Sequence, residues 1–110
     1  MKVHLISKRT IEQFISIHAR AKASFENWLQ KIKSANWSEP NDIKKTFNSV
    51  DFLKKGSNRV VFDIAGNNYR MICKCAFGDS EVHLFVCWIG THAEYDQLCA
   101  DKKQYIINDY

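Results

Sequence analysis

The hydrophobic pattern of this 110-residue chain changes its period once, near residue 59. Before that point, apolar side chains recur every three or four residues, which is the period of an amphipathic helix. After it they recur every second residue or run on without a break, as they do in β-strands. The change predicts helices in the first half and a sheet in the second, which is the organisation of an α+β protein.

Two helices are predicted in the first half, after a short strand at residues 1–6. Ser7 suits the N-cap of the first helix, whose apolar positions have the spacing i, i+3, i+4 and i+7: Ile11, Phe14, Ile15 and His18. The second helix repeats this spacing with Phe25, Trp28, Leu29 and Ile32. Such an aromatic stripe can be a platform on which RNA bases stack, but at helical spacing it more often belongs to the core. We therefore expect the stripe to be buried.

A short third helix is expected between Ser38 and Phe47, because Pro40 is tolerated only in the first turn of a helix. Residues 48–58 are then expected to form a loop that carries Lys54 and Lys55. Two lysines in an exposed loop are suited to contacting the phosphates of a nucleic acid.

Three strands are predicted in the second half, at residues 59–65, 69–77 and 82–89, and the first two form a hairpin around Gly66-Asn67-Asn68. Side-chain alternation places seven apolar residues on one face of the hairpin: Val60, Phe62, Ile64, Met71, Cys73, Cys75 and Phe77. The other face carries Arg59, Arg70 and Lys74, together with Asp63, which could pair with Arg70.

We expect one domain spanning residues 1–110, in which the N-terminal strand and the helices pack on one face of a small antiparallel sheet and leave the other face available. With one Pro and four Gly, the chain lacks the composition of a linker or a disordered segment. No apolar run approaches the ~20 residues that span a bilayer, and the first residues lack the features of a secretory signal. We expect a cytoplasmic protein with no membrane partner.

The net charge of +4 is unevenly distributed along the chain. Residues 1–58 carry eleven basic and five acidic side chains, whereas residues 59–110 carry five basic and seven acidic ones. A basic half is consistent with a polyanionic partner such as a nucleic acid. Arg70 and Lys74 lie ~13 Å apart along their strand at ~3.3 Å per residue, a spacing suited to a tract of polyanion, although cations on strands are often only solvated.

The four cysteines, Cys73, Cys75, Cys87 and Cys99, could be taken for a zinc site. Cys73 and Cys75 alternate within an apolar strand, however, whereas structural zinc ligands are usually spaced Cys-x2–4-Cys at polar turns. We expect buried or half-buried thiols, and neither a metal nor another cofactor. His92 differs from the other histidines because it follows Gly90-Thr91 at the end of an apolar strand, where polar side chains are often functional.

The sequence resembles the HigB family of toxins from bacterial type II toxin–antitoxin modules, within the RelE-like superfamily of mRNA interferases. The resemblance is carried by residues 58–70 (NRVVFDIAGNNYR) and 89–96 (IGTHAEYD), with shorter matches at residues 4–7 (HLIS) and at Trp37-x-x-Pro40-x-Asp42-Ile43-Lys44. It implies a RelE-like fold and an endoribonuclease that cleaves mRNA, often on the translating ribosome. It also implies a cognate HigA-type antitoxin. The toxin would then contact DNA only indirectly, through this antitoxin. The tail from about residue 97 diverges from the family pattern.

The resemblance assigns Arg70, His92 and Tyr95 to the catalytic site, and it matches Arg59 and Lys74 to positions that are commonly basic. RNA cleavage without a metal needs a base for the 2′-hydroxyl, cations for the phosphorane and an acid for the leaving oxygen. Arginine supplies a permanent charge that binds phosphate, and histidine exchanges protons near neutral pH. The sequence leaves open which of His92 and Tyr95 handles which proton.

Two other function classes fit the same residues. A non-catalytic RNA- or ribosome-binding module would use the same basic sheet face to bind the phosphate backbone. A pure protein-interaction domain would show no salt-dependent affinity for RNA.

Overall fold

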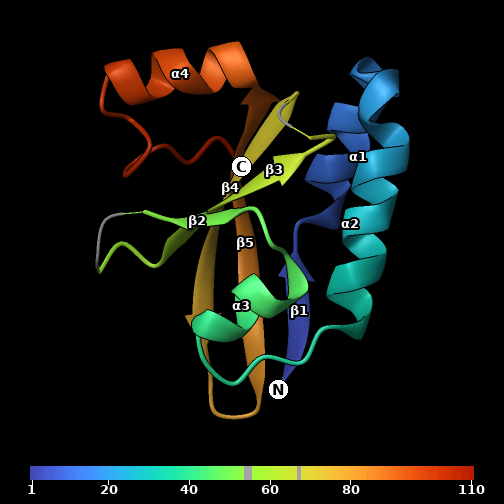
Figure 1. Cartoon of the computed structure of the whole chain (residues 1–110), viewed down its shortest axis with the longest axis vertical. Coiled ribbons are helices and arrows are strands. Elements are labelled where there is room, and N and C mark those ends of the chain that lie inside the picture. The colour runs from blue at the N-terminus through green and yellow to red at the C-terminus, as the bar shows by residue number, and fades with distance from the viewer. Residues whose placement is uncertain (54–55, 67) are drawn as a thin grey trace.

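The computed structural model describes residues 1–53, 56–66 and 68–110. Its helices are α1 (Lys8–Ile17), α2 (Lys22–Ser34), α3 (Asn41–Thr46) and α4 (His92–Ala100), with a 3₁₀ turn at Ala19–Ala21. Its strands are β1 (Lys2–Ile6), β2 (Val50–Phe52), β3 (Arg59–Ile64), β4 (Tyr69–Phe77) and β5 (Glu81–Thr91). This order of elements confirms the α+β class (Figure 1).

The five strands form one sheet in the order β1-β5-β4-β3-β2. The sheet is mixed rather than purely antiparallel, because β1 runs parallel to β5 with Lys2 opposite Glu81. The predicted antiparallel sheet was wrong in this respect. Hydrophobic alternation reveals that residues 1–6 form a strand, but it carries no information on which distant strand they join or in which direction.

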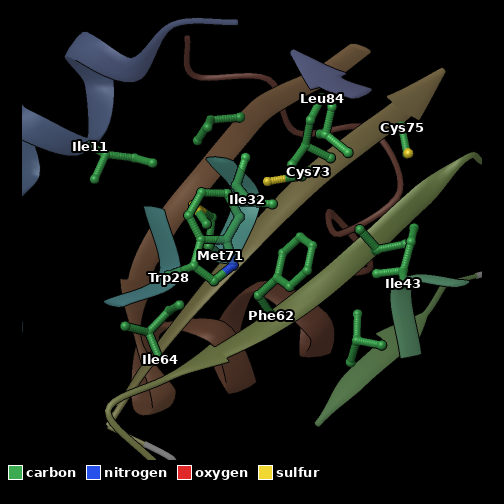
Figure 2. Packing of buried hydrophobic residues seen from close by; sticks show 14 of the residues in the cluster. Ile11, Trp28, Ile32, Ile43, Phe62, Ile64, Met71, Cys73, Cys75 and Leu84 are labelled. Atoms are coloured by element: carbon green, nitrogen blue, oxygen red, sulfur yellow. The ribbon is translucent and has the colours of Figure 1, made fainter. Parts of the chain in front are cut away.

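Helices α1 and α2 cover one face of the sheet and enclose the main core (Figure 1). Figure 2 shows Trp28 and Ile32 of α2 pointing toward Phe62 and Met71 of the sheet. Trp28 is only 3% exposed, and its ring centroid lies 5.3 Å from that of Phe62. The aromatic stripe of α2 is therefore core, as predicted, and it is no platform for RNA bases.

The predicted hairpin is confirmed, with Phe62 opposite Met71 and Arg59 opposite Lys74. The start of the first helix is also confirmed, although Ser7 has a left-handed backbone (φ 68°) and its side chain makes no capping hydrogen bond. The expected loop at residues 48–58 was partly wrong, because β2 pairs with β3 at the edge of the sheet. Lys54 and Lys55 lie outside the described residues.

The second sheet face is partly covered by α4 and the C-terminal tail, which corrects the expectation of an open face. Five buried residues form a second apolar cluster there: Val61, Ile72, Cys87, Trp88 and Leu98. Leu53, Tyr95 and Ile107 pack against it. Consecutive residues Cys87 and Trp88 both join this cluster because the pairing of β4 with β5 shifts register between Ile72 and Cys73.

Cys73, Cys75 and Cys87 are buried and Cys99 is half-buried, as expected of core thiols. Burial raises the pKa of the Cys75 thiol to about 11 and also raises the pKa of the Cys73 thiol. In the part of the chain that the structure describes, no helix has the length and apolar character needed to cross a bilayer.

Candidate active site at the junction of the sheet and helix α4

The junction between β5 and α4 is fixed by a reciprocal pair of hydrogen bonds. The Thr91 hydroxyl accepts from the backbone N–H of Glu94 at 3.2 Å, and the Glu94 carboxylate accepts from the backbone N–H of Thr91 at 2.8 Å. Together they form a capping box at the start of α4. The helix therefore begins at His92, and the residues at i, i+3 and i+4 from this point share one helix face: His92, Tyr95 and Asp96.

Gly90 lies directly opposite Arg70 in the sheet. A Cβ atom at position 90 would come within 2.4 Å of the indole ring of Trp88. The lack of a side chain at Gly90 thus allows the Trp88 ring to lie along the sheet next to the cross-strand position of Arg70. A packing requirement, rather than backbone freedom, explains glycine here.

Arg70 is held between a carboxylate and an aromatic ring. Its Nε lies 3.3 Å from Oδ1 of Asp63, its cross-strand neighbour, which confirms the pairing foreseen from the sequence. Its guanidinium carbon lies 5.1 Å from the centre of the Tyr95 ring, within the range of a cation–π contact. The side chain is only 14% exposed. Arg70 is therefore a fixed, partly desolvated cation rather than a mobile surface charge.

His92 is oriented by Asp96 from the next turn of α4. Its Nδ1 lies 3.0 Å from Oδ2 of Asp96. A carboxylate can only accept, so Nδ1 carries the proton and Nε2 of the neutral ring has a free lone pair. The backbone N–H of His92 also donates to the carbonyl of Asn68 at 3.1 Å, which ties the helix start to the β3–β4 turn.

Tyr95 lies at the border between the apolar cluster and the polar residues. Its ring packs near that of Trp88, with 6.1 Å between the centroids. Burial, followed by a hydrogen bond with Cys99, raises the pKa of the Tyr95 phenol far above its usual value. The phenol is therefore neutral at physiological pH, and its ring packs against the guanidinium of Arg70.

Asp63 is the carboxylate on which both Arg70 and His92 act. Burial raises the pKa of the Asp63 carboxyl, and repulsion from Asp51 adds to this effect, while Arg70 and His92 oppose it. Arg70 and His92 are thus both close enough to act electrostatically on one carboxylate. We call Asp63, Arg70, His92, Tyr95 and Asp96 the polar cluster.

Two of the predicted RNA-binding residues lie at the other end of the second face. Lys74 is exposed on β4. Arg59 instead donates from Nη1 to the backbone carbonyls of Gln104 at 3.2 Å and Ile107 at 2.7 Å, and so anchors the tail. The structure brings Arg70, His92 and Tyr95 together and keeps Arg59 and Lys74 apart from them. Lys54 and Lys55 lie outside the described residues.

Sequence reasoning missed Asp96 as a site residue. A signal was present, because Asp96 follows His92 by four residues, the spacing that puts two side chains on one helix face. Among the described residues, no three His, Cys, Asp or Glu side chains are grouped so that they could hold a metal ion.

Residues 21–98 match the family described as HigB toxin, the RelE-like toxic component of a toxin–antitoxin system. The chain belongs to the HigB toxin family. Members of this family include the mRNA interferase HigB of Escherichia coli O6:H1, which is 30% identical over 96 residues, 87% of this chain and 91% of the relative.

More distant relatives with the name HigB match over a similar share of the chain. The mRNA interferase toxin HigB of E. coli K12 is 24% identical over 98 residues, which is 89% of this chain and 92% of the relative. The mRNA interferase HigB of Shigella flexneri gives the same values. The matched residues include the whole polar cluster, because the family match ends at residue 98.

Proposed function

We propose that this chain is the toxin of a type II toxin–antitoxin module and that it cleaves mRNA in the cytoplasm as an endoribonuclease. Membership of the HigB toxin family supports the class of protein, and relatives that carry the name mRNA interferase support the activity. The structural observation that carries the proposal is the meeting of a fixed cation, Arg70, and an oriented imidazole, His92, because Arg70 packs on the ring of Tyr95, one helical turn from His92.

The polar cluster suits attack by the 2′-hydroxyl of RNA on its own phosphodiester. Nε2 of His92 takes the proton of the 2′-hydroxyl as the 2′-oxygen bonds to phosphorus. The guanidinium of Arg70 stabilises the charge that develops on the phosphorane oxygens. The bond from phosphorus to the 5′-oxygen then breaks, and the leaving oxygen takes a proton from solvent. One product ends in a 2′,3′-cyclic phosphate and the other begins with a 5′-hydroxyl.

Tyr95 and Asp96 act through these two residues. The Tyr95 ring limits the positions open to the guanidinium, and Asp96 sets the tautomer of His92. Because the RNA supplies the nucleophile and Arg70 supplies the positive charge, this route requires no metal ion.

The test uses the purified chain and an end-labelled mRNA fragment in the presence of excess chelator. We expect new ends with a 2′,3′-cyclic phosphate and a 5′-hydroxyl, and no cleavage after a 2′-deoxy substitution at the scissile nucleotide. Arg70→Lys keeps the charge but loses the planar guanidinium, so it should cleave roughly 10²–10³-fold more slowly.

Binding of the RNA without new ends would favour the alternative of a non-catalytic RNA- or ribosome-binding module. Cleavage that stops in chelator and leaves a 5′-phosphate would contradict the mechanism while leaving the family unaffected. A toeprint on translating ribosomes, compared with cleavage of free RNA, tests whether the substrate is ribosome-bound mRNA.

A HigA-type antitoxin is the partner that we propose for this chain. Co-expression with that antitoxin should restore growth to cells that the chain alone inhibits. The chain should bind operator DNA only when the antitoxin is present.

A further inference from the structure

A hollow of about 370 Å³ lies at the end of the second sheet face, away from the polar cluster. Its floor comes from β4 and β5, where Lys74 and Phe85 are cross-strand neighbours. Its far wall is the end of the C-terminal tail, which contributes Asn108 and Tyr110. The hollow is thus built from segments that are far apart in the sequence.

The tail is held in place by specific bonds rather than by loose packing. Arg59 binds the carbonyls of Gln104 and Ile107, and the backbone N–H of Asp109 donates to the carbonyl of Cys87 at 2.9 Å. The tail that carries Tyr110 is therefore attached to the sheet at two strands, β3 through Arg59 and β5 through Cys87. A wall fixed in this way can form a site before any ligand arrives.

The hollow offers the two chemical features that a nucleotide needs. Phe85 and Tyr110 are 39% and 48% exposed, so each leaves part of an aromatic ring available to solvent. Lys74 adds an exposed ammonium group beside Phe85. An aromatic surface stacks on a base of any identity, and an ammonium group neutralises a phosphate.

A row of aromatic rings continues from this hollow across the sheet. The ring of His83 lies 6.5 Å from that of Phe85, and the ring of His4 on β1 lies 6.0 Å from that of His83. Lys74 and Arg70 share one face of β4, four residues and ~13 Å apart. The sheet between Arg70 and Lys74 is covered by Leu98 and Ile107. One strand of RNA could therefore reach the hollow from the polar cluster by passing over α4 and the tail.

We propose, on the basis of the RNA-cleaving function proposed above, that the hollow binds one nucleotide of the single-stranded substrate, a short distance along the strand from the scissile phosphate. Phe85 and Tyr110 hold the base, and Lys74 holds its phosphate. The tail from about residue 97 thereby becomes part of the substrate site, although the family match ends at residue 98 and so leaves nearly all of the tail out.

The test measures how kcat/KM depends on substrate length. Oligoribonucleotides that contain one cleavage site are lengthened by single nucleotides on either side of it. For the unaltered chain, kcat/KM should rise at the nucleotide that first reaches the hollow. Phe85→Ala and Tyr110→Ala should each reduce that rise by roughly 5- to 100-fold, the usual contribution of a stacked base. An abasic nucleotide at that position should remove it in the unaltered chain.

Phe85→Trp keeps a stacking surface and should retain the rise. Ile106→Ala is the matched control, because Ile106 is 75% exposed in the same tail and does not line the hollow. Thermal melting of each variant checks that the exposed substitutions leave the fold intact.

A second measurement separates this proposal from the proposed function. Fluorescence anisotropy with an RNA that carries a 2′-deoxy residue at the cleavage site reports binding without catalysis. If the unaltered chain cleaves no RNA but Phe85→Ala still weakens binding, the cleavage proposal fails and the nucleotide site stands. Unchanged length dependence and unchanged binding in both alanine variants would overturn the nucleotide site. The same would follow if these variants lost only their neutralisation by an antitoxin, which would make the hollow a protein-docking surface.

Discussion

Arg70 and His92 reach the polar cluster from different elements, and an aspartate holds each of them. Asp63 is the cross-strand neighbour of Arg70 on β3, and Asp96 lies one helical turn after His92. The contact with Asp96 is made through Nδ1 of the imidazole, which leaves Nε2 for the proton transfer proposed above. On the proposed mechanism, the two carboxylates position Arg70 and His92.

His92→Gln should lower the rate of the chemical step by roughly 10²–10⁴ without a matching loss of RNA affinity, because glutamine cannot exchange the proton. Asp96→Asn should cause a smaller loss, about tenfold or more, since an amide no longer selects one tautomer of the ring. Single-turnover cleavage measures both rates, and anisotropy measures affinity.

Asp101→Asn, a neutralisation at the end of the same helix, serves as the control. His92 is partly exposed and Asp96 largely exposed, so neither change should alter the melting temperature appreciably. A His92→Gln variant that cleaves at the parental rate would remove His92 from the mechanism.

At the scale of secondary structure, residues 90–96 serve both the shape of the junction between β5 and α4 and the proposed active site. Gly90, Thr91 and Glu94 shape the passage from strand to helix, whereas His92, Tyr95 and Asp96 form the helix face that the proposed mechanism uses. The sequence indicated the functional importance of this segment, and helical spacing placed Tyr95 near His92. The pKa of Tyr95 could not be foreseen, because it depends on the burial of the phenol against the second apolar cluster.

Thr91→Ala should lower the free energy of unfolding by about 0.5–2 kcal/mol, the usual cost of losing an N-cap side chain. It should also slow cleavage, because His92 is the first residue of α4. Thr91→Ser retains the hydroxyl and should behave like the parent in both measurements. Chemical denaturation followed by circular dichroism gives the free energies. Equal stability of the alanine and serine variants would mean that the cap contributes nothing.

The start of α3 provides a prediction on pH. Hydrogen bonds from the backbone N–H groups of Ser38 and Glu39 reach the carboxylate of Asp42, with Lys45 nearby. The bond from Ser38, followed by the interaction with Lys45, lowers the pKa of Asp42 in the folded chain below its ordinary value of 3.8. Its ionised form therefore stabilises the fold above pH 3.8, and this contribution is lost as the pH falls through the lowered pKa.

Asp42→Asn should accordingly be less stable than the parent at pH 7, and the difference should shrink as the pH falls below 3.8. Urea denaturation of both proteins across this range measures the difference. Glu39→Gln, a neutralisation three residues away, gives the reference behaviour of an exposed carboxylate. A difference that stays constant with pH would contradict the assignment.

At the scale of the whole molecule, local pattern predicted the elements and their buried faces but not how distant segments meet. The change of period near residue 59 identified the helices and the hairpin, and alternation placed Arg70 and Lys74 on one face. Alternation also suggested that this face was open. The anchoring of the tail could not be predicted from the polar composition of residues 97–110. Arg59 binds the backbone carbonyls of Gln104 and Ile107, and every residue type has such a carbonyl.

Arg59→Ala should loosen the tail and expose Cys87 beneath it. Hydrogen bonds to a charged group are each worth roughly 1.5–3 kcal/mol, and about 1.4 kcal/mol corresponds to a tenfold change in the open population. The rate of alkylation of Cys87 by iodoacetamide should thus rise about tenfold or more, as measured by peptide mass spectrometry. Cys73, buried under the helices, is the internal reference, and Lys74→Ala is the control variant. An unchanged rate at Cys87 would show that Arg59 does not secure the tail.

Strand β1 is synthesised long before its partner. Lys2 pairs with Glu81, so at ~5–20 residues per second the ribosome needs roughly 4–16 s to make the intervening residues. Until β3 and β4 have also been made, α1 and α2 have no sheet to cover, and their apolar faces are available to chaperones. The polar cluster, drawn from residues 63–96, must form later still. If the chain has the function proposed above, a nascent copy cannot cleave its own mRNA until the ribosome has translated the codons for residues 63–96.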